Sequence, residues 1–472
     1  IGEISHEAKI CWGGGLSNKH NSLKLKKFKG NNTRRKVIIT TIILSILLLS
    51  GIYLYSSFAA FTEEKHFNVI NVTVQDPGDI YFAYYVDGEI TRSIPTEGIG
   101  YTLDIEKSNC TNGVSISFDD YNYAVITSYK NYNATDYTRT RCNLYFKKLD
   151  MQLTDYIKKL ALYDNPNLSY DGTIDNNLRY IGSNPNNYVS VDGELWRIIG
   201  VMNNIDDGTG KKESRIKLIR AESIGSYSWE TSDSSVNSGL GINEWSQAKL
   251  MKLLNPGYAS ELVGGSLYWN SGSGTCYKGS NNNTTSCDFT SIGIKDKLKS
   301  LISDAVWHTG SNDGKTYTYS NILTSRFYEL ERTSNNGKIC TSGTYCNDTV
   351  ERTTTWTGRV GLMYASDYGY ATSGGSTTDR ATCLNKELYN WDSSSVSYCK
   401  NNDWLLSSTQ WLLSPSAYSS SACRVFAIRL NGIVINGDAF GGNVIRPVVY
   451  LKSSVKITSG DGSESNPYTL FV

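Results

Sequence analysis

An uninterrupted apolar run near the N-terminus constrains this chain more than any other feature. Residues Val37 to Tyr55 are 19 consecutive residues without a charge, long enough to cross ~30 Å of hydrocarbon as a helix. Basic residues precede the run, and Glu63 and Glu64 follow it. We therefore predict a transmembrane helix over residues 37–57, with the N-terminus in the cytoplasm and everything after Phe61 outside the cell.

Two other interpretations of this run compete with the transmembrane helix. A cleaved signal peptide is compatible with the small residues around Ser57-Phe58-Ala59, although its apolar region is normally about 7 to 15 residues long. A buried core helix is the other alternative, and it is disfavoured because no amphipathic pattern interrupts the run. The uncleaved anchor is the preferred interpretation.

The charge of the chain is unevenly distributed. Residues 1–36 carry nine Lys or Arg against Glu3 and Glu7, a net +7, so with +1 for the whole chain the remainder is −6. We interpret residues 1–36 as a basic cytoplasmic tail that sets orientation or contacts anionic lipid, and we predict no nucleic-acid partner. Because the first Met is Met151, Ile1 to Lys29 is expected to be a fragment or a wrongly assigned upstream extension.

Composition favours an extracellular β-rich protein. Aromatic residues make up 12% of the chain, including 33 Tyr, and only 19% is charged, a balance unlike that of a cytosolic helical enzyme. We expect a small β-sandwich spacer over residues 61–147, because short apolar runs there alternate with Asp-Gly and Asn-Gly turns. Its expected strands are Phe67 to Val74, Ile80 to Val86, Val114 to Phe118, Tyr123 to Tyr129 and Cys142 to Phe146.

Residues 148–472 are predicted to form one large α+β domain. A helix is expected over Leu149 to Leu162, and a hairpin over Tyr188 to Met202 turns at Asp192-Gly193. Further expected elements are a strand over Ile216 to Arg220 and helices over Trp245 to Leu254 and Ile294 to Trp307.

The end of this domain, about residues 404–451, is predicted to display a ligand-binding surface. Val425 to Leu430 and Ile433 to Ile435 flank Asn431-Gly432, a pair typical of a tight hairpin. Residues 436–443 have no apolar period and are interpreted as an exposed loop. A closing strand is expected over Val444 to Leu451, with Trp411, Arg446, Pro447 and Tyr450 assigned to the scaffold.

An ordered set of motifs in this chain resembles a known family. The run from Trp411 to Pro415, the Asn431-Gly432 hairpin and Ile445 to Leu451 resemble the C-terminal core of C-type-lectin-like domains of the formylglycine-generating-enzyme-like subgroup, which includes retroelement-diversified variable proteins. Three other motifs resemble those of membrane-anchored surface proteins of gut Firmicutes: 176–182 (NNLRYIG), 196–200 (WRIIG) and 361–370 (GLMYASDYGY). The resemblance covers about residues 61–472, and it implies a rigid scaffold that displays side chains to a ligand.

Cysteine spacing predicts a disulfide framework. Nearest-neighbour pairing joins Cys110 with Cys142, Cys276 with Cys287, Cys340 with Cys346 and Cys383 with Cys399. Zinc is the competing account, but no Cys-x-x-Cys and no adjacent His occur in these segments. Cys423 is left over, and is expected to be buried, a product of variation in the display region, or a reactive thiol.

Catalysis is weakly supported by the residues. The formylglycine-generating resemblance implies an oxidase with a copper-holding cysteine pair, yet the C-terminal core offers Cys423 alone. A hydrolase would need a base, and His308 is expected at a helix end where capping or exposure is its role. The acidic pairs Asp119-Asp120 and Asp206-Asp207 are interpreted as solvated turns, with calcium ligation as the alternative. We therefore expect no cofactor and no enzyme.

The remaining function class is recognition of an extracellular protein or glycan. Tyr, Ser, Asn and Arg together form the residue mixture of adaptable binding loops. The alternative is that these are tolerated polar loop residues, and further alternatives for the whole protein are an oxidoreductase or a structural envelope component. The predicted ligand-binding residues are Tyr418, Ser420, Arg424, Phe426, Arg429, Asn431, Asn436, Asp438, Phe440 and Asn443.

Overall fold

The described part of the chain has two separate hydrophobic cores. The buried residues of the first end at Phe146, and those of the second begin at Leu149. The computed structural model describes residues 80–95, 101–119, 124–130, 140–163, 165–232, 241–312, 316–333, 352–417 and 423–472. The predicted tail, membrane helix and first strand lie outside these residues. Within the described ranges, no helix is long and apolar enough to cross a membrane.

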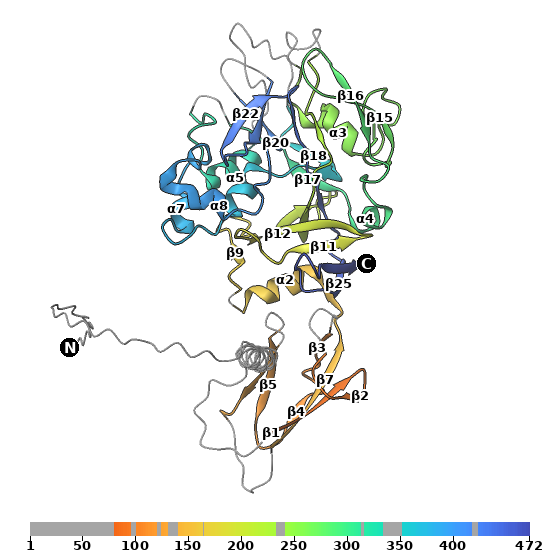
Figure 1. Cartoon of the computed structure of the whole chain (residues 1–472), viewed down its shortest axis with the longest axis vertical. Coiled ribbons are helices and arrows are strands. Elements are labelled where there is room, and N and C mark those ends of the chain that lie inside the picture. The colour runs from red at the N-terminus through yellow and green to blue at the C-terminus, as the bar shows by residue number, and fades with distance from the viewer. Residues whose placement is uncertain are drawn as a thin grey trace, which may run out of the picture. The chain divides into compact units, whose positions relative to one another are not determined.

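The first core lies between a five-stranded sheet and a β-hairpin (Figure 1). Strand β7 alternates clearly, with Cys142, Leu144 and Phe146 buried and the residues between them more exposed, as expected when one face of a sheet is covered. Phe118 and Val125 from the hairpin pack on this face. The strands are β1 (Ile80–Val86), β2 (Glu89–Thr91), β3 (Tyr101–Leu103), β4 (Asn109–Cys110), β5 (Ser115–Asp119), β6 (Ala124–Ser128) and β7 (Thr140–Lys148).

Turn chemistry explains the connections of this small sheet. Asp87 and Gly88 both have positive φ, 50° and 90°, which a two-residue antiparallel hairpin requires, and they join β1 to β2. The predicted Cys110–Cys142 disulfide is present and links directly paired residues of β4 and β7. Strands β1 and β7 pair in parallel.

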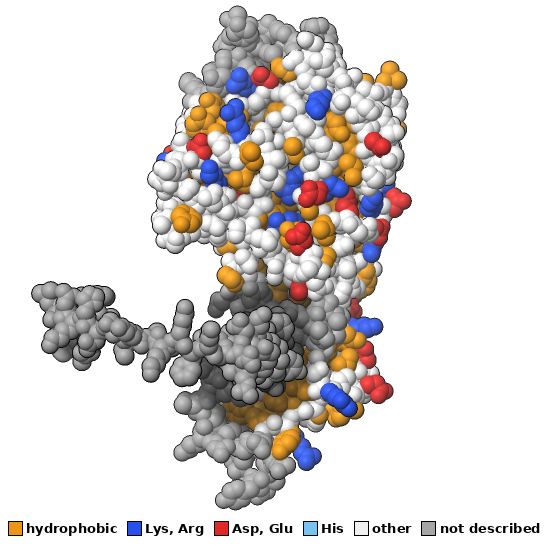
Figure 2. All heavy atoms as spheres, viewed as in Figure 1, with side chains coloured by type: hydrophobic (Ala, Val, Ile, Leu, Met, Phe, Trp, Pro, Cys, Tyr) orange, Lys and Arg blue, Asp and Glu red, His pale blue; other side chains and the backbone are white. Residues whose placement is uncertain are grey.

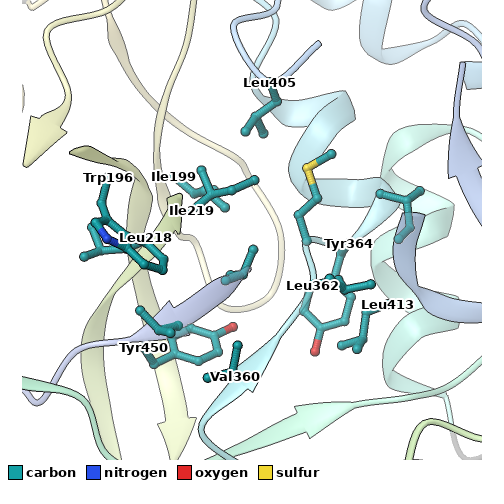
Figure 3. Close-up of a cluster of buried hydrophobic side chains, with 14 of the residues drawn as sticks. Trp196, Ile199, Leu218, Ile219, Val360, Leu362, Tyr364, Leu405, Leu413 and Tyr450 are labelled. Carbon is teal, nitrogen blue, oxygen red and sulfur yellow. The ribbon is translucent and has the colours of Figure 1, made fainter. Parts of the chain in front are cut away.

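The second core is built on a ten-stranded sheet with β12 and β13 at its centre. Trp196, Ile199, Leu218 and Ile219 from these two strands are buried together (Figure 3). Helix α2 (Leu153–Ala161) buries Leu153, Ile157 and Leu160 at helical spacing. The strands are β8 (Met151–Gln152), β9 (Leu168–Tyr170), β10 (Leu178–Tyr180), β11 (Tyr188–Val191), β12 (Glu194–Asp206), β13 (Lys212–Arg220), β19 (Val360–Gly361), β24 (Val448–Tyr450), β25 (Lys456–Ser459) and β26 (Tyr468–Phe471).

A second, five-stranded sheet carries the predicted display region. Its order is β14-β23-β20-β21-β22, with β14 (Ser226–Ser228), β20 (Gln410–Ser416), β21 (Arg424–Ile428), β22 (Val434–Asp438) and β23 (Gly442–Val444). A further hairpin is β15 (Ser273–Tyr277) with β16 (Thr284–Asp288), linked by the Cys276–Cys287 disulfide. Strands β17 (Ala305–His308) and β18 (Thr355–Gly358), which are distant in the chain, form a two-stranded antiparallel sheet.

Short helices fill the connections of the large domain. They are η3 (Trp245–Gln247), α3 (Lys249–Leu254), α4 (Asp296–Leu301), α5 (Thr324–Arg332), α6 (Ala365–Tyr370), α7 (Arg380–Leu384), η4 (Leu388–Asn390), η5 (Ser394–Val396) and α8 (Ser397–Asn401). The Cys383–Cys399 disulfide joins α7 to α8. Figure 1 shows this pair on one side of the domain and the β15–β16 hairpin on the other.

Three sequence expectations about these elements were wrong. The helix expected over Ile294 to Trp307 ends at Leu301, because Ala305 and Trp307 alternate with more exposed neighbours and form strand β17. The strand expected over Val444 to Leu451 is split into β23 and β24, with Pro447, which has no backbone N–H to donate, between them. Part of the expected loop 436–443 is strand, since Asn436 to Asp438 pair with β21.

Candidate functional site

The predicted ligand-binding residues separate along the hairpin β21–β22 instead of forming one patch. Arg424 pairs with Asp438 at one end of the hairpin, and Arg429 and Asn431 lie at its turn. Five strand residues separate these ends, about 13 Å at the usual rise. Tyr418 and Ser420 lie outside the described residues.

Two of the predicted residues are interior ones, so their expected exposure is corrected. Phe426 is 1% exposed, and its ring packs edge-on against Phe327 of α5 at 5.0 Å. Asn436, directly opposite, is 7% exposed and donates from Nδ2 to Ser416 Oγ at 3.3 Å. Residues Val425 to Ile428 of β21 are buried on both faces of the strand, so Phe426 has no exposed side to occupy. Asn436 pairs with Phe426 in β22, which the loop interpretation of residues 436–443 did not foresee.

Three predicted residues lie at the Arg424 end of the hairpin and define what we call the Arg424 face: Arg424, Asp438 and Phe440. Asn443 belongs to β23, where Val444 pairs with Gln410 opposite Ile428, so it lies toward the other end of β21. Arg424 Nε lies 3.3 Å from Asp438 Oδ1, and their side chains are 30% and 44% exposed. Phe440 and Asn443 are partly exposed in the turn and strand that follow. The face thus offers both charges and an aromatic ring to solvent.

A buried polar chain fixes the backbone of Arg424. The Arg424 carbonyl accepts from Nδ2 of Asn243 at 2.7 Å, and Asn243 Oδ1 accepts from Nε of Arg352 at 2.7 Å. Asn243 is 0% exposed and Arg352 4% exposed. Sequence reasoning missed both residues, because an isolated Asn and an isolated Arg in polar segments carry no spacing signal.

The turn of residues 439–441, which we call the Phe440 turn, is held by the neighbouring disulfide-bonded hairpin β15–β16. The Phe440 carbonyl accepts from Ser228 Oγ at 2.6 Å and from the Gly279 N–H at 3.1 Å. Gly279 follows β15, whose Cys276 is bonded to Cys287. Lys278 is exposed beside this turn, and its side chain passes close to Gly442. Residues far apart in sequence therefore support one rigid edge.

The other end of the hairpin is a separate, more exposed site. Asn431 Nδ2 donates to Asp392 at 3.0 Å, and Lys400 Nζ donates to the Asn431 carbonyl at 3.0 Å. Gly432 has a φ of 85°, and a Cβ there would lie 2.6 Å from the Lys400 side chain. The Asn431-Gly432 turn is therefore anchored on α8, away from Arg424.

Two of the sequence motifs, 176–182 and 361–370, contribute Arg179 and Asp367 to a second site, a buried charge cluster that also contains Asp171 and Lys217. Arg179 donates to Asp171 at 3.0 Å and to Asp367 at 2.5 Å, and Lys217 lies 2.5 Å from the other Asp367 oxygen. All four side chains are at most 2% exposed. Asp367 also accepts from the Tyr364 N–H at 2.9 Å and so caps α6.

Burial and charge compete in this cluster. Burial raises the pKa of Asp367, but the charges of Lys217 and Arg179 outweigh it and hold that pKa at about 2. Burial lowers the pKa of Lys217 to about 8 in spite of Asp367. The four charges sum to zero, which is how proteins tolerate such burial.

Two further titratable groups border the cluster. Burial raises the pKa of Glu331 to about 7 against the opposing charge of Arg332, and Glu331 accepts from both the N–H and Oγ of Ser366. Burial, reinforced by Arg332, lowers the pKa of His308 to about 4. His308 belongs to strand β17, so its expected position at a helix end was wrong.

The remaining candidate chemistry is dispersed. Cys423 is 1% exposed, and its thiol donates to the Gly241 carbonyl at 2.9 Å. Cys340, Cys346 and Asp120 lie outside the described residues. Asp206 and Asp207 accept from backbone N–H groups in an exposed turn. Asp119 ends strand β5 and is buried, so its interpretation as a solvated turn residue was wrong. Within the described ranges, no group of three or more His, Cys, Asp or Glu is placed to hold a metal.

On the face drawn in Figure 2, acidic and basic side chains are intermixed instead of gathered by sign. No family model, no curated protein and no solved structure matches the chain. Function must therefore be argued from the geometry of the Arg424 face and the buried cluster, and the C-type-lectin-like resemblance stays a prediction.

Proposed function

We propose that this chain is a membrane-anchored, extracellular recognition protein that binds a protein or glycan through the Arg424 face. In this proposal the apolar run Val37 to Tyr55 is the anchor and residues 80–148 are a spacer. Residues 149–472 form the binding head, which we also propose to be C-type-lectin-like from its motifs. The observation that carries the proposal is the rigid support beneath Arg424, Asp438 and Phe440.

The disulfides support an extracellular location. Among the residues that the structure describes, three cysteine pairs are bonded, at sequence separations of 32, 11 and 16 residues. Such bonds persist in oxidising compartments and are rare in the cytosol. Their placement in both the spacer and the head argues that the whole described part of the chain is exposed to the same compartment.

Pre-organisation supports recognition at the Arg424 face. The Arg424 carbonyl is fixed through Asn243, and the Phe440 carbonyl is fixed by two hydrogen bonds. A surface ordered before binding loses little conformational entropy on association. Arginine and aromatic side chains are the usual anchors of such surfaces, and here Arg424 and Phe440 are both partly exposed.

The test is binding of the purified full chain to glycan and cell-surface protein arrays, with two matched variants. Arg424→Ala removes the proposed anchor, while Arg429→Ala removes an exposed arginine from the far end of the same hairpin. We expect the first to weaken binding about tenfold or more and the second to leave it unchanged. Equal binding by both variants, or a greater loss with Arg429→Ala, would contradict the proposed site.

A further inference from the structure

Lys217 and Asp367 stand in the interior as a potential reacting pair. Lys217 Nζ lies 2.5 Å from Oδ2 of Asp367, and each side chain is 1% exposed. We propose that these residues are joined by an amide bond between Nζ and Cγ. The bond would cross-link strand β13 to helix α6 over a sequence separation of 150 residues. This inference does not depend on the proposed function.

An aromatic enclosure surrounds the amine. Lys217 Nζ lies 4.0 Å from the ring centroid of Tyr364, 5.4 Å from that of Tyr450 and 5.5 Å from that of Trp307. Figure 3 shows Tyr364 and Tyr450 within the buried cluster. Because condensation releases water, an enclosure that excludes water favours the amide. Replacing two buried charges by one neutral group also removes the cost of keeping both ions away from solvent.

The reaction is a condensation without any change of oxidation state. The Lys217 ammonium loses one proton, and the resulting amine attacks Asp367 Cγ to form the C–N bond. The nitrogen then loses a second proton, and the bond between Cγ and Oδ1 breaks. Oδ1 leaves as water with those two protons, so an ammonium and a carboxylate become one amide and one water. Holding the two groups in contact replaces a bimolecular step by an intramolecular one.

The neighbouring groups suit this sequence of steps. The Tyr364 N–H holds Oδ2, the oxygen that remains as the amide carbonyl, so the cap of α6 survives. The guanidinium of Arg179 contacts Oδ1, the oxygen that leaves. Glu331 is bound to Ser366, the residue before Asp367. Its charge acts on both Lys217 and Asp367, so Glu331 can influence the transfer of protons from the amine.

Charge balance is kept when the bond forms. The ion-paired cluster holds Arg179 and Lys217 against Asp171 and Asp367. The amide removes one charge of each sign and leaves Arg179 paired with Asp171 at 3.0 Å. The product therefore needs no counter-ion that the site does not already hold.

A second lysine–carboxylate contact provides an internal control. Lys249 Nζ lies 3.0 Å from Glu261, but these side chains are 29% and 26% exposed. Water reaches this pair and stabilises both ions, so we expect no amide there. Comparing the two lysine–carboxylate pairs therefore separates the effect of burial on amide formation from the effect of proximity.

The test is mass spectrometry of the full chain after reduction and denaturation. We expect an intact mass one water molecule below that of the sequence. Proteolysis should give a branched peptide that links Lys217 to Asp367, and separate Lys249 and Glu261 peptides. A wild-type mass equal to that of the sequence overturns the proposal. A lost water with Lys217 and Asp367 released on separate peptides overturns it too, because it marks a local dehydration instead.

Three variants extend the test. Lys217→Arg keeps the charge but cannot form the amide, so its mass should equal that of its sequence, whereas Lys249→Arg should retain the loss of water. Glu331→Gln should slow or abolish the loss, and undiminished cross-linking in that variant would remove Glu331 from the mechanism. If Lys217→Arg does not fold, the intact mass of the wild-type chain still tests the proposed amide bond.

Discussion

At the scale of single residues, burial decides which predicted binding residues can act. Arg424 and Phe426 are two positions apart on β21, yet Arg424 is partly exposed and Phe426 lies in the core. Composition could nominate these residues but could not show which are covered, because Phe426 is buried by Phe327 of α5, while Arg424 lies at the end of the strand. Asn243 and Arg352 were not predictable at all, since their role depends on contacts between distant segments.

The core assignment of Phe426 predicts a large loss of stability on truncation. Phe426→Ala removes a ring packed on Phe327 and should lower the free energy of unfolding by about 3 to 5 kcal/mol. Arg429→Ala, at an exposed position, should change it by about 0.5 kcal/mol or less. Urea unfolding of both variants measures the difference. Similar small losses in both would mean that Phe426 is not a core residue.

Glu331 predicts a pH dependence of stability. Its folded pKa is about 7, above the ordinary 4.5, so the native state binds more protons than the unfolded state between those values. Stability from this group is therefore complete below pH about 4.5 and is lost as pH rises through about 7. The effect of His308 on the pH dependence of stability has the opposite sign, because burial lowers its pKa to about 4. Stability from this group therefore rises with pH.

The contribution of Glu331 is isolated by comparing wild type with Glu331→Gln at several pH values. Glutamine keeps an acceptor for Ser366 but does not titrate, so the variant should lose less stability than wild type between pH about 4.5 and 7. Unfolding curves recorded over that range test this. Parallel pH profiles for the two proteins would show that Glu331 does not titrate as proposed.

At the scale of elements, the local sequence pattern predicted which segments form strands better than it predicted where those strands end. The hairpin about Asn431-Gly432 and the β11–β12 hairpin about Asp192-Gly193 are present, because both turns carry residues suited to positive φ. The segment Val444 to Leu451 looked continuous, but Pro447 interrupts it. What could not be predicted is the docking of β15–β16 against the Phe440 turn, which joins elements over 150 residues apart.

That docking predicts a local effect of one disulfide. Replacing both Cys276 and Cys287 by Ser should free the hairpin that carries Gly279, and amide exchange at Gly279 and in the Phe440 turn should quicken. Replacing Cys383 and Cys399, which lie at α7–α8, should leave that turn protected. Unchanged amide exchange in the Cys276/Cys287 variant would show that the Phe440 turn does not depend on the disulfide-bonded hairpin.

At the scale of the whole molecule, the disulfides determine the redox environment in which the protein can fold. Each of the three disulfides should contribute about 3 to 4 kcal/mol in the chain-entropy model, and domains of this kind have only about 5 to 15 kcal/mol in total. Full chain produced under reducing conditions should therefore be largely unfolded, as measured by circular dichroism and proteolysis. An equally stable reduced protein would argue against an oxidising environment.

The most direct test of the Arg424 face is the footprint of a bound ligand. Hydrogen exchange of the full chain, with and without a ligand retained from the arrays, reports which backbone segments it covers. We expect slower exchange around Arg424 and in residues 438–440, with the Asn431-Gly432 turn unchanged. Protection confined to that turn, or to α7 and α8, would contradict the proposed recognition site.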